Sequence, residues 1–277
     1  ISAYEYGWRV MQFPETIIGT ALGITVFPTL ADLANRNDRA GLRRTASWTL
    51  RLVLALAVPA AVGLLVLGRP LTVLLFQRGA FDATTTDRVF LALQFFALGL
   101  IFHSALEVAS RLFYAKKDMW TPLWAALAGL VTNATLGWLL LPSLAQGSIA
   151  LSNSLGVGLQ VSILLLVAWR RLNGIEARTL LLSLTRTLIA SAVMATTVIG
   201  FRLACGQLAG PGPVPSSGLG PRLIGVGGLA IGAVTYLLAA ALLGSEEIRH
   251  LPALLLQRDR KLKMITRKSM EGDRASE

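Results

Sequence analysis

Long apolar runs separated by short polar connections recur along the whole chain. A run of about 20 apolar residues is long enough to cross a bilayer as an α-helix. The runs lack the two-residue alternation of membrane β-strands, and backbone groups in hydrocarbon must be satisfied within each segment. The pattern therefore predicts an all-α, polytopic transmembrane helix bundle of about seven spans, at roughly 8–33, 48–67, 89–114, 120–141, 148–169, 181–203 and 222–244.

The first run, from Trp8 to Ala34, combines this apolar length with a polar stripe. Charge at membrane depth is tolerated where it faces water or the interior of a bundle. The stripe therefore predicts a helix that lines a hydrated cavity. The alternative is that Arg9 reaches toward the headgroups while the glycines only pack against another helix. At about 100° per residue, roughly a third of the helix circumference collects Arg9, Gln12, Thr16, Gly19, Thr20 and Gly23.

Basic residues are concentrated in alternate connections. The connections after the first, third and fifth runs, together with the C-terminal tail, hold 20 of the 26 Lys and Arg residues. The positive-inside rule predicts that this side is cytoplasmic, with the start of the first helix outside and the tail inside. Two interpretations fit the basic tail, 245–277: an amphipathic helix on the anionic inner leaflet, or a solvated stop-transfer segment.

Two outward connections have their own character. Pro70–Phe76 is apolar but too short to span, so it is predicted to be an interfacial segment. The stretch 205–221 is rich in Gly, Pro and Ser and is predicted to be a flexible external linker. It would separate the last transmembrane helix, 222–244, from a six-span bundle at 1–204. Prolines inside predicted helices are tolerated as kinks and can act as hinges; they are Pro14, Pro28 and Pro59.

Composition narrows the possible functions. The chain is 54% hydrophobic and 15% charged, whereas an ordinary soluble domain is about 25% charged. A net charge of +11 suggests nucleic acid in a soluble protein, but here membrane topology explains the basic residues and no nucleic-acid partner is expected. The first residue is Ile1, with no initiator Met or signal-like segment, which indicates a piece of a longer protein.

Signals for enzymatic chemistry are weak. A single cysteine excludes an internal disulfide, and two histidines argue against a histidine-rich metal site. The sequence contains no P-loop, HExxH, CxxC or GxSxG motif. A prenyl-transfer enzyme would need a cluster of acids to bind magnesium diphosphate. Only Asp82 and Asp87, in an outer connection, come close to such a cluster. We therefore expect a protein that is not an enzyme and that has no metal or cofactor.

Polar residues inside the spans are the more useful signal. His103, Glu107 and Arg111 share one helix face, and Glu107 precedes Arg111 in the favourable order for an intrahelical ion pair. Asn133 lies between two glycines, Gly129 and Gly137, which is also typical of helix packing. These residues are either structural or part of a cavity. Several helices with one polar or small face indicate a bundle around a partly hydrated cavity, as in transporters.

Three strings in the chain resemble the MurJ (MviN) family of bacterial lipid II flippases. They are Arg9–Pro14 with Ile18–Gly23 and Phe27–Leu30, then Leu75–Phe81, and then Phe113–Asp118 with Thr121 and Pro122. The resemblance implies the superfamily of multidrug, oligosaccharidyl-lipid and polysaccharide exporters, in which two six-helix lobes surround a central cavity. It implies that this chain is the C-terminal lobe plus two extra helices, and that the N-terminal lobe of the same protein is missing from it.

The resemblance also implies a function and a site. Family members move lipid II, the undecaprenyl-diphosphate-linked peptidoglycan precursor, across the bacterial inner membrane by alternating access, for cell-wall synthesis. Arg9 matches a functional arginine of the cationic cavity, preceded by Tyr6 and followed by Pro14. With Gln12 and Thr16 it forms the implied substrate-binding set. Some members carry an acid where this chain has Gln12, so a proton- or cation-linked role at that position is not carried over.

Two other functions remain open at this stage. One is a flippase for another polyprenyl-diphosphate-linked glycan, which would differ in its sugar contacts. The other is a non-transporting membrane scaffold that recruits partners through its basic tail. The scaffold hypothesis predicts that Arg9→Ala is harmless while deletion of 245–277 is not.

Overall fold

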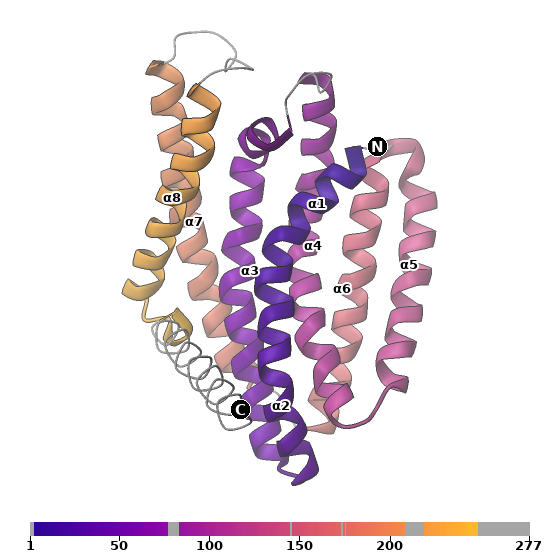
Figure 1. Ribbon diagram of the computed structural model, residues 1–277. Coiled ribbons are helices and arrows are strands. Elements are labelled where there is room, and N and C mark those ends of the chain that lie inside the picture. The colour runs from indigo at the N-terminus through magenta and orange to yellow at the C-terminus, as the bar shows by residue number, and fades with distance from the viewer. Residues whose placement is uncertain are drawn as a thin grey trace, which may run out of the picture.

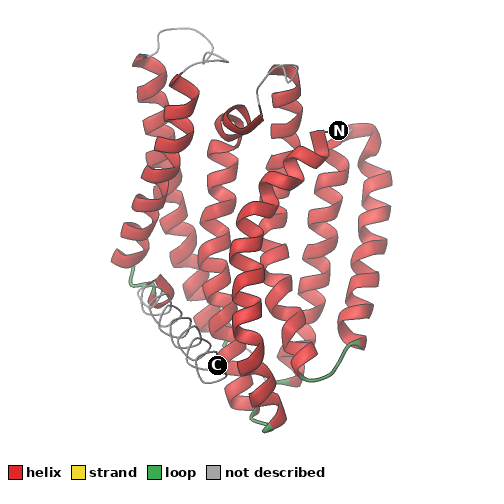
Figure 2. Ribbon diagram, viewed as in Figure 1, coloured by secondary structure: helices red, strands yellow, loops and turns green. Residues whose placement is uncertain are grey.

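Membrane-crossing helices running side by side make up the protein (Figures 1 and 2). The computed structural model describes residues 3–76, 83–144, 146–172, 174, 176–208 and 219–248. Within these ranges every regular element is a helix, and seven helical segments are long and apolar enough to cross a membrane, which confirms the predicted bundle. The elements are α1 (Ala3–Glu15), the π-helix η1 (Thr16–Thr20), α2 (Ala21–Asn35), α3 (Arg39–Phe76), α4 (Ala83–Ala115), α5 (Trp120–Leu144), α6 (Gln146–Arg171), α7 (Ala177–Leu208) and α8 (Leu219–Leu242).

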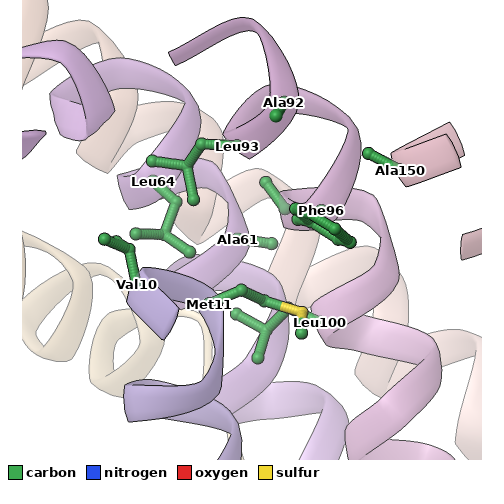
Figure 3. Packing of buried hydrophobic residues seen from close by; sticks show 10 residues of the cluster. Val10, Met11, Ala61, Leu64, Ala92, Leu93, Phe96, Leu100 and Ala150 are labelled. Atoms are coloured by element: carbon green, nitrogen blue, oxygen red, sulfur yellow. The ribbon is translucent and has the colours of Figure 1, made fainter. Parts of the chain in front are cut away.

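One core cluster forms where α1 packs against α3, α4 and α6 (Figure 3). Met11 of α1 and Phe96 of α4 are completely buried there. Gly7 allows this approach, because a Cβ at that position would lie 3.3 Å from the Cβ of Ala92. The inward side of α1 is thus fixed by packing, which leaves its opposite side as a surface of the bundle.

The α5 helix lies along α6 through a seam of small residues. Gly129 and Gly156 bring the two backbones together: a Cβ on Gly156 would lie 2.6 Å from the Gly129 carbonyl oxygen. The other side of α5 exposes tryptophans toward both of its ends, including Trp120 (70% exposed) and Trp138 (80%). Tryptophan is typical of the two membrane–water interfaces, so this side of α5 fits the surrounding lipid.

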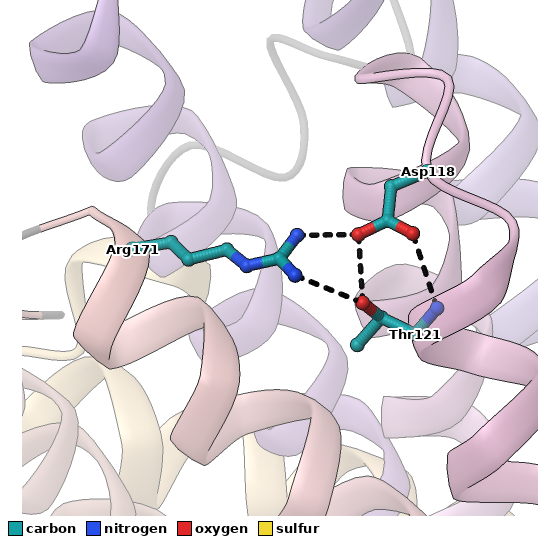
Figure 4. A network of polar contacts seen from close by, with 3 residues as sticks. All are labelled: Asp118, Thr121 and Arg171. Carbon is teal, nitrogen blue, oxygen red and sulfur yellow. Dashed lines mark hydrogen bonds and ion pairs between the residues drawn. The ribbon is translucent and has the colours of Figure 1, made fainter.

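A polar network anchors the start of α5 (Figure 4). The Asp118 carboxylate accepts hydrogen bonds from the Thr121 backbone N–H (3.1 Å) and hydroxyl (2.7 Å), and it pairs with Arg171 at the end of α6. Burial alone would raise the pKa of the Asp118 carboxyl. The hydrogen bonds from Thr121 and Arg171 and the charge of Arg171 outweigh burial and lower that pKa to about 2.

Several predicted boundaries differ from the structure. Pro70–Phe76 is not a separate segment, because it continues α3 as its last turns. The helices α7 and α8 reach Leu208 and Leu219, so the linker predicted at 205–221 is helical at both ends. Residues 209–218 of that linker, Asp82, and the tail beyond Ile248 lie outside the described residues.

The connections rich in arginine and lysine gather at one end of the bundle. The α2–α3, α4–α5 and α6–α7 connections and the end of α8 all lie toward the lower end in Figure 1, and the N-terminus lies toward the upper end. Helices that alternate in direction place every second connection at the same end of the bundle. The basic connections therefore belong to a single side of the membrane.

Candidate functional site

The side of α1 that faces away from the core carries the predicted substrate-binding residues. Arg9, Gln12 and Thr16 are all exposed, whereas Val10 and Met11 are buried. None of the three polar side chains has a hydrogen-bond or ion-pair partner among the described residues. Two large apolar side chains accompany them, so we call this surface the open face and define it as Arg9, Gln12, Phe13, Thr16 and Ile17.

The polar stripe predicted along the first span is interrupted. Gly19 and Gly23, predicted to share the side of Arg9, are buried and face α4 instead. The cause is the π-helical turn Thr16–Thr20, in which the Ala21 N–H reaches back to the Thr16 carbonyl. A wider turn shifts the direction of every later side chain. The prediction of one continuous stripe is therefore wrong, and only its first part lies on the open face.

The glycine within the π turn brings the first span close to α4. A Cβ on Gly19 would lie 3.1 Å from the Ser104 Cα, 3.4 Å from the Glu107 Cγ and 3.6 Å from a Glu15 carboxylate oxygen. Two carboxylates, from α1 and from α4, thus flank one glycine. Glu15 was not among the predicted site residues. The sequence does contain a signal for Glu15: it is an acid in an apolar run, with no basic residue four positions away.

The Glu107–Arg111 ion pair predicted on α4 forms in the structure. Its Nη2–Oε2 distance is 2.8 Å, and both side chains are half-buried. Arg111 lies directly over Gly23, where an added Cβ would be 2.4 Å from the Arg111 Nε. That Nε is buried and has no hydrogen-bond partner. Together with Glu15, the pair places two acids and one arginine beside the π turn.

His103 lies one turn before Glu107 on α4, and its ring also contacts α1 and α6. Its Nε2 lies 3.2 Å from the Asn153 amide oxygen on α6, and its ring stands edge to face with Trp8 at 5.3 Å between centroids. These contacts join α1, α4 and α6. Neither Trp8 nor Asn153 was a predicted site residue, and both belong to helix packing.

Asn133 is remote from the open face. Its amide oxygen accepts a hydrogen bond from the Ser152 hydroxyl at 2.9 Å, across the α5–α6 seam. The nearby Gly156 is close enough that an added Cβ would lie 3.1 Å from the Asn133 Cβ. The structure therefore gives Asn133 a packing role and does not bring it to Arg9.

A cavity inside the bundle is far too small for a lipid headgroup. It has a volume of about 20 Å³ and an apolar lining from α3, α4 and α6, with Ser47 as a polar residue at its wall. Pockets for small molecules usually measure about 300–1,000 Å³. This cavity is therefore not a binding site for a large polar ligand.

A match to a protein family model shows to which family the chain belongs. A family model described as "Lipid II flippase MurJ" matches residues 1–208. The chain belongs to the lipid II flippase MurJ family. Flippases move a lipid and are not a class of catalytic enzyme. The match covers α1 to α7, including the open face.

Curated MurJ relatives agree with this assignment. The lipid II flippase MurJ of Burkholderia cenocepacia is 33% identical over 175 residues, which cover 63% of this chain and 34% of the relative. The probable lipid II flippase MurJ of Rickettsia prowazekii is 30% identical and covers 59% and 32%. That of Rhizobium meliloti is 34% identical and covers 72% and 37%. The chain thus spans about a third of the length of these relatives.

A solved structure supports the fold. It is titled "Lipid II flippase MurJ, inward closed conformation", and it matches with a TM-score of 0.69 at 21% identity. The match covers 87% of this chain and 46% of the solved chain. The arrangement of helices is therefore that of a MurJ transporter, as the resemblance implied.

Proposed function

We propose that this chain forms the C-terminal lobe and two extra helices of a lipid II flippase. The single observation that carries the proposal is the open face within the matched residues, where Arg9, Gln12 and Thr16 are exposed and have no partner in the part of the chain that the structure describes. In this proposal the open face lines the path of the headgroup. A second lobe, supplied by the N-terminal part of the same protein, closes the path from the other side.

The chemistry of the open face suits a diphosphate. An arginine guanidinium can bind phosphate oxygens in a bidentate manner, and Gln12 and Thr16 add hydrogen-bond donors. Phe13 (74% exposed) and Ile17 (59%) offer apolar surface beside them. The lipid tail stays in hydrocarbon while the headgroup crosses, and rocking of two lobes gives alternating access.

The proposed location is the bacterial inner membrane, with the basic end of the bundle toward the cytoplasm. The clustering of basic connections at one end supports this orientation. It places the N-terminal end of α1 on the outer side. The tail 245–277 is then cytoplasmic and carries eight basic residues that can contact anionic lipids.

Growth of cells depleted of their own lipid II flippase tests the proposal. The chain is expressed alone and, in parallel, preceded by the N-terminal lobe of a full-length MurJ relative. Arg9→Ala and Arg9→Lys are compared with the matched control Arg36→Ala, an exposed arginine paired with Asp32 at the end of α2. Membrane insertion is measured for every variant.

The expected result is loss of growth with Arg9→Ala, partial growth with Arg9→Lys, and normal growth with Arg36→Ala, at equal insertion. Normal growth with Arg9→Ala would contradict the proposal. If deletion of 245–277 then abolished growth, the scaffold function would be favoured instead. Rescue limited to cells that lack a flippase for a different glycan would identify another polyprenyl-diphosphate substrate.

A further inference from the structure

Two prolines inside α3 leave two backbone carbonyls without their helical partners. Proline has no N–H, so the carbonyl four residues before it loses its intrahelical hydrogen bond. Pro59 frees the carbonyl of Ala55, and Pro70 frees that of Val66. In hydrocarbon no water replaces these bonds, so a donor from another helix stabilises such a carbonyl.

Both carbonyls accept hydrogen bonds from side chains of the last two helices. The Tyr236 hydroxyl of α8 donates to the Ala55 carbonyl, and the Arg202 guanidinium of α7 donates to the Val66 carbonyl. Ala55 and Tyr236 are almost completely buried. Thus the backbone groups that the prolines expose are the ones that the α7–α8 pair contacts.

A buried ion pair adds a third contact one turn below Ala55. Arg51 of α3 lies 3.7 Å from Glu247, which follows α8, and the two side chains are only 11% and 5% exposed. The chain reaches this position through a turn at Gly244, whose φ is +70° and whose carbonyl accepts a hydrogen bond from Arg186 of α7. The three polar contacts therefore lie at successive heights along α3.

Prolines elsewhere in the described helices differ. Pro14, Pro28 and Pro142 also lie inside helices, and the carbonyls that they free belong to Val10, Ile24 and Trp138. Within the described part of the chain, no side chain donates to any of these three carbonyls. Among these five prolines of the described helices, only the two on the side of α3 that α7 and α8 cover free a carbonyl that accepts a hydrogen bond from a side chain of another helix.

We propose that the carbonyls freed by Pro59 and Pro70 are docking points that set the position of the α7–α8 pair along α3. Among the described helices, α7 and α8 pack on each other and on α3. Apolar burial adds little driving force between helices in lipid, because lipid tails are equally apolar, whereas interhelical hydrogen bonds contribute there. In this proposal the two directional bonds set the register. In this proposal Pro59 and Pro70 free the Ala55 and Val66 carbonyls to accept these bonds, and the prolines do not act as hinges.

A double-mutant cycle on the full chain in detergent tests this proposal. Tyr236→Phe removes the donor, and Pro59→Ala supplies an N–H that satisfies the Ala55 carbonyl from within α3. Alone, Tyr236→Phe should lower the midpoint of thermal unfolding by about 2–4 °C. In the Pro59→Ala background this shift should shrink, because the carbonyl no longer depends on the hydroxyl. Tyr236 also forms a hydrogen bond with Thr187. Tyr236→Phe removes this bond in both backgrounds, so its contribution cancels from the difference between the two shifts.

A parallel cycle pairs Arg202→Met with Pro70→Ala, and Pro142→Ala in α5 is the matched control for both. Coupling at either carbonyl, with none between Tyr236 and Pro142, supports docking at that point. Additive shifts in both cycles would overturn the proposal. Hydrogen exchange needs no proline variant: Tyr236→Phe should speed exchange in α8, Arg202→Met should speed it in α7, and both should leave α5 and α6 unchanged. Unchanged exchange in α7 and α8 for both variants would equally overturn the proposal.

Discussion

The α5–α6 seam offers a prediction whose magnitude follows from the structure. A Cβ on Gly156 would lie 2.6 Å from the Gly129 carbonyl oxygen, whereas ordinary contact begins at 3.4 Å. The deficit, about 0.8 Å, cannot be relieved by rotating a side chain, because the oxygen belongs to the backbone. Gly156→Ala should therefore push α5 away from α6, which is the helix that holds it.

Two opposing effects set the size of the change. Replacing glycine by alanine inside a helix stabilises it by up to about 1 kcal/mol. Overpacking a close contact costs about 1–3 kcal/mol. Gly63→Ala in α3 is the matched control, because a Cβ there meets nothing within 4 Å and only the favourable effect remains. The free energy of unfolding of the two variants should thus differ by about 1–3 kcal/mol.

Thermal unfolding in detergent, followed by tryptophan fluorescence, measures this difference. At about 2–4 °C per kcal/mol for a chain of this size, the midpoint of Gly156→Ala should lie roughly 2–12 °C below that of Gly63→Ala. A midpoint for Gly156→Ala equal to or above that of Gly63→Ala would refute the reasoning. The two backbones would then not approach as closely as the seam requires.

Three further results are expected. The folded pKa of Asp118 is lowered, so its ion pair stabilises the protein above the ordinary pKa of 3.8, and this contribution is lost as pH falls toward about 2. The unfolding midpoints of wild type and Asp118→Asn should therefore converge over that pH range. A constant gap between the two midpoints would contradict the assignment. Gly23→Ala should lower the midpoint by about 2–4 °C in wild type but not in an Arg111→Ala background, because the three atoms nearest to the added Cβ all belong to the Arg111 side chain. Equal losses in the two backgrounds would exclude that contact. Collapsing the membrane potential should slow flipping in vesicles, since about 2.3 kcal/mol per charge per 100 mV acts on charge that moves across the membrane; an unchanged rate would exclude this coupling.

Apolar length and charge distribution predicted most of the fold. Spans, helix directions and the side that carries the basic connections follow from hydrophobic length and the positive-inside rule, and both depend on composition over many residues. The Glu107–Arg111 pair was also predictable, because residues four apart are neighbours on any α-helix. Local periodicity is sufficient for such features.

Features that depend on tertiary contacts were not predictable from the sequence. The π turn at Thr16–Thr20 breaks the regular 3.6-residue period, so the stripe projected beyond it was assigned to the wrong side. Pro59 was interpreted as a possible hinge, since nothing local indicates that Tyr236, far along the chain, satisfies the carbonyl it frees. Asn133 was ambiguous for the same reason, until Ser152 across the seam gave it a packing role.

We propose that Arg9 on the open face binds the headgroup during transport. Direct measurement of lipid II movement in vesicles tests it, with the chain joined to the N-terminal lobe of a full-length MurJ relative and equal amounts of inserted protein. Because a hydrogen bond to a charged group is worth about 1.5–3 kcal/mol, Arg9→Ala should slow flipping roughly 10-fold or more, while Arg36→Ala leaves the rate unchanged. Flipping by Arg9→Ala at the wild-type rate would contradict the account and reduce Arg9 to a membrane anchor.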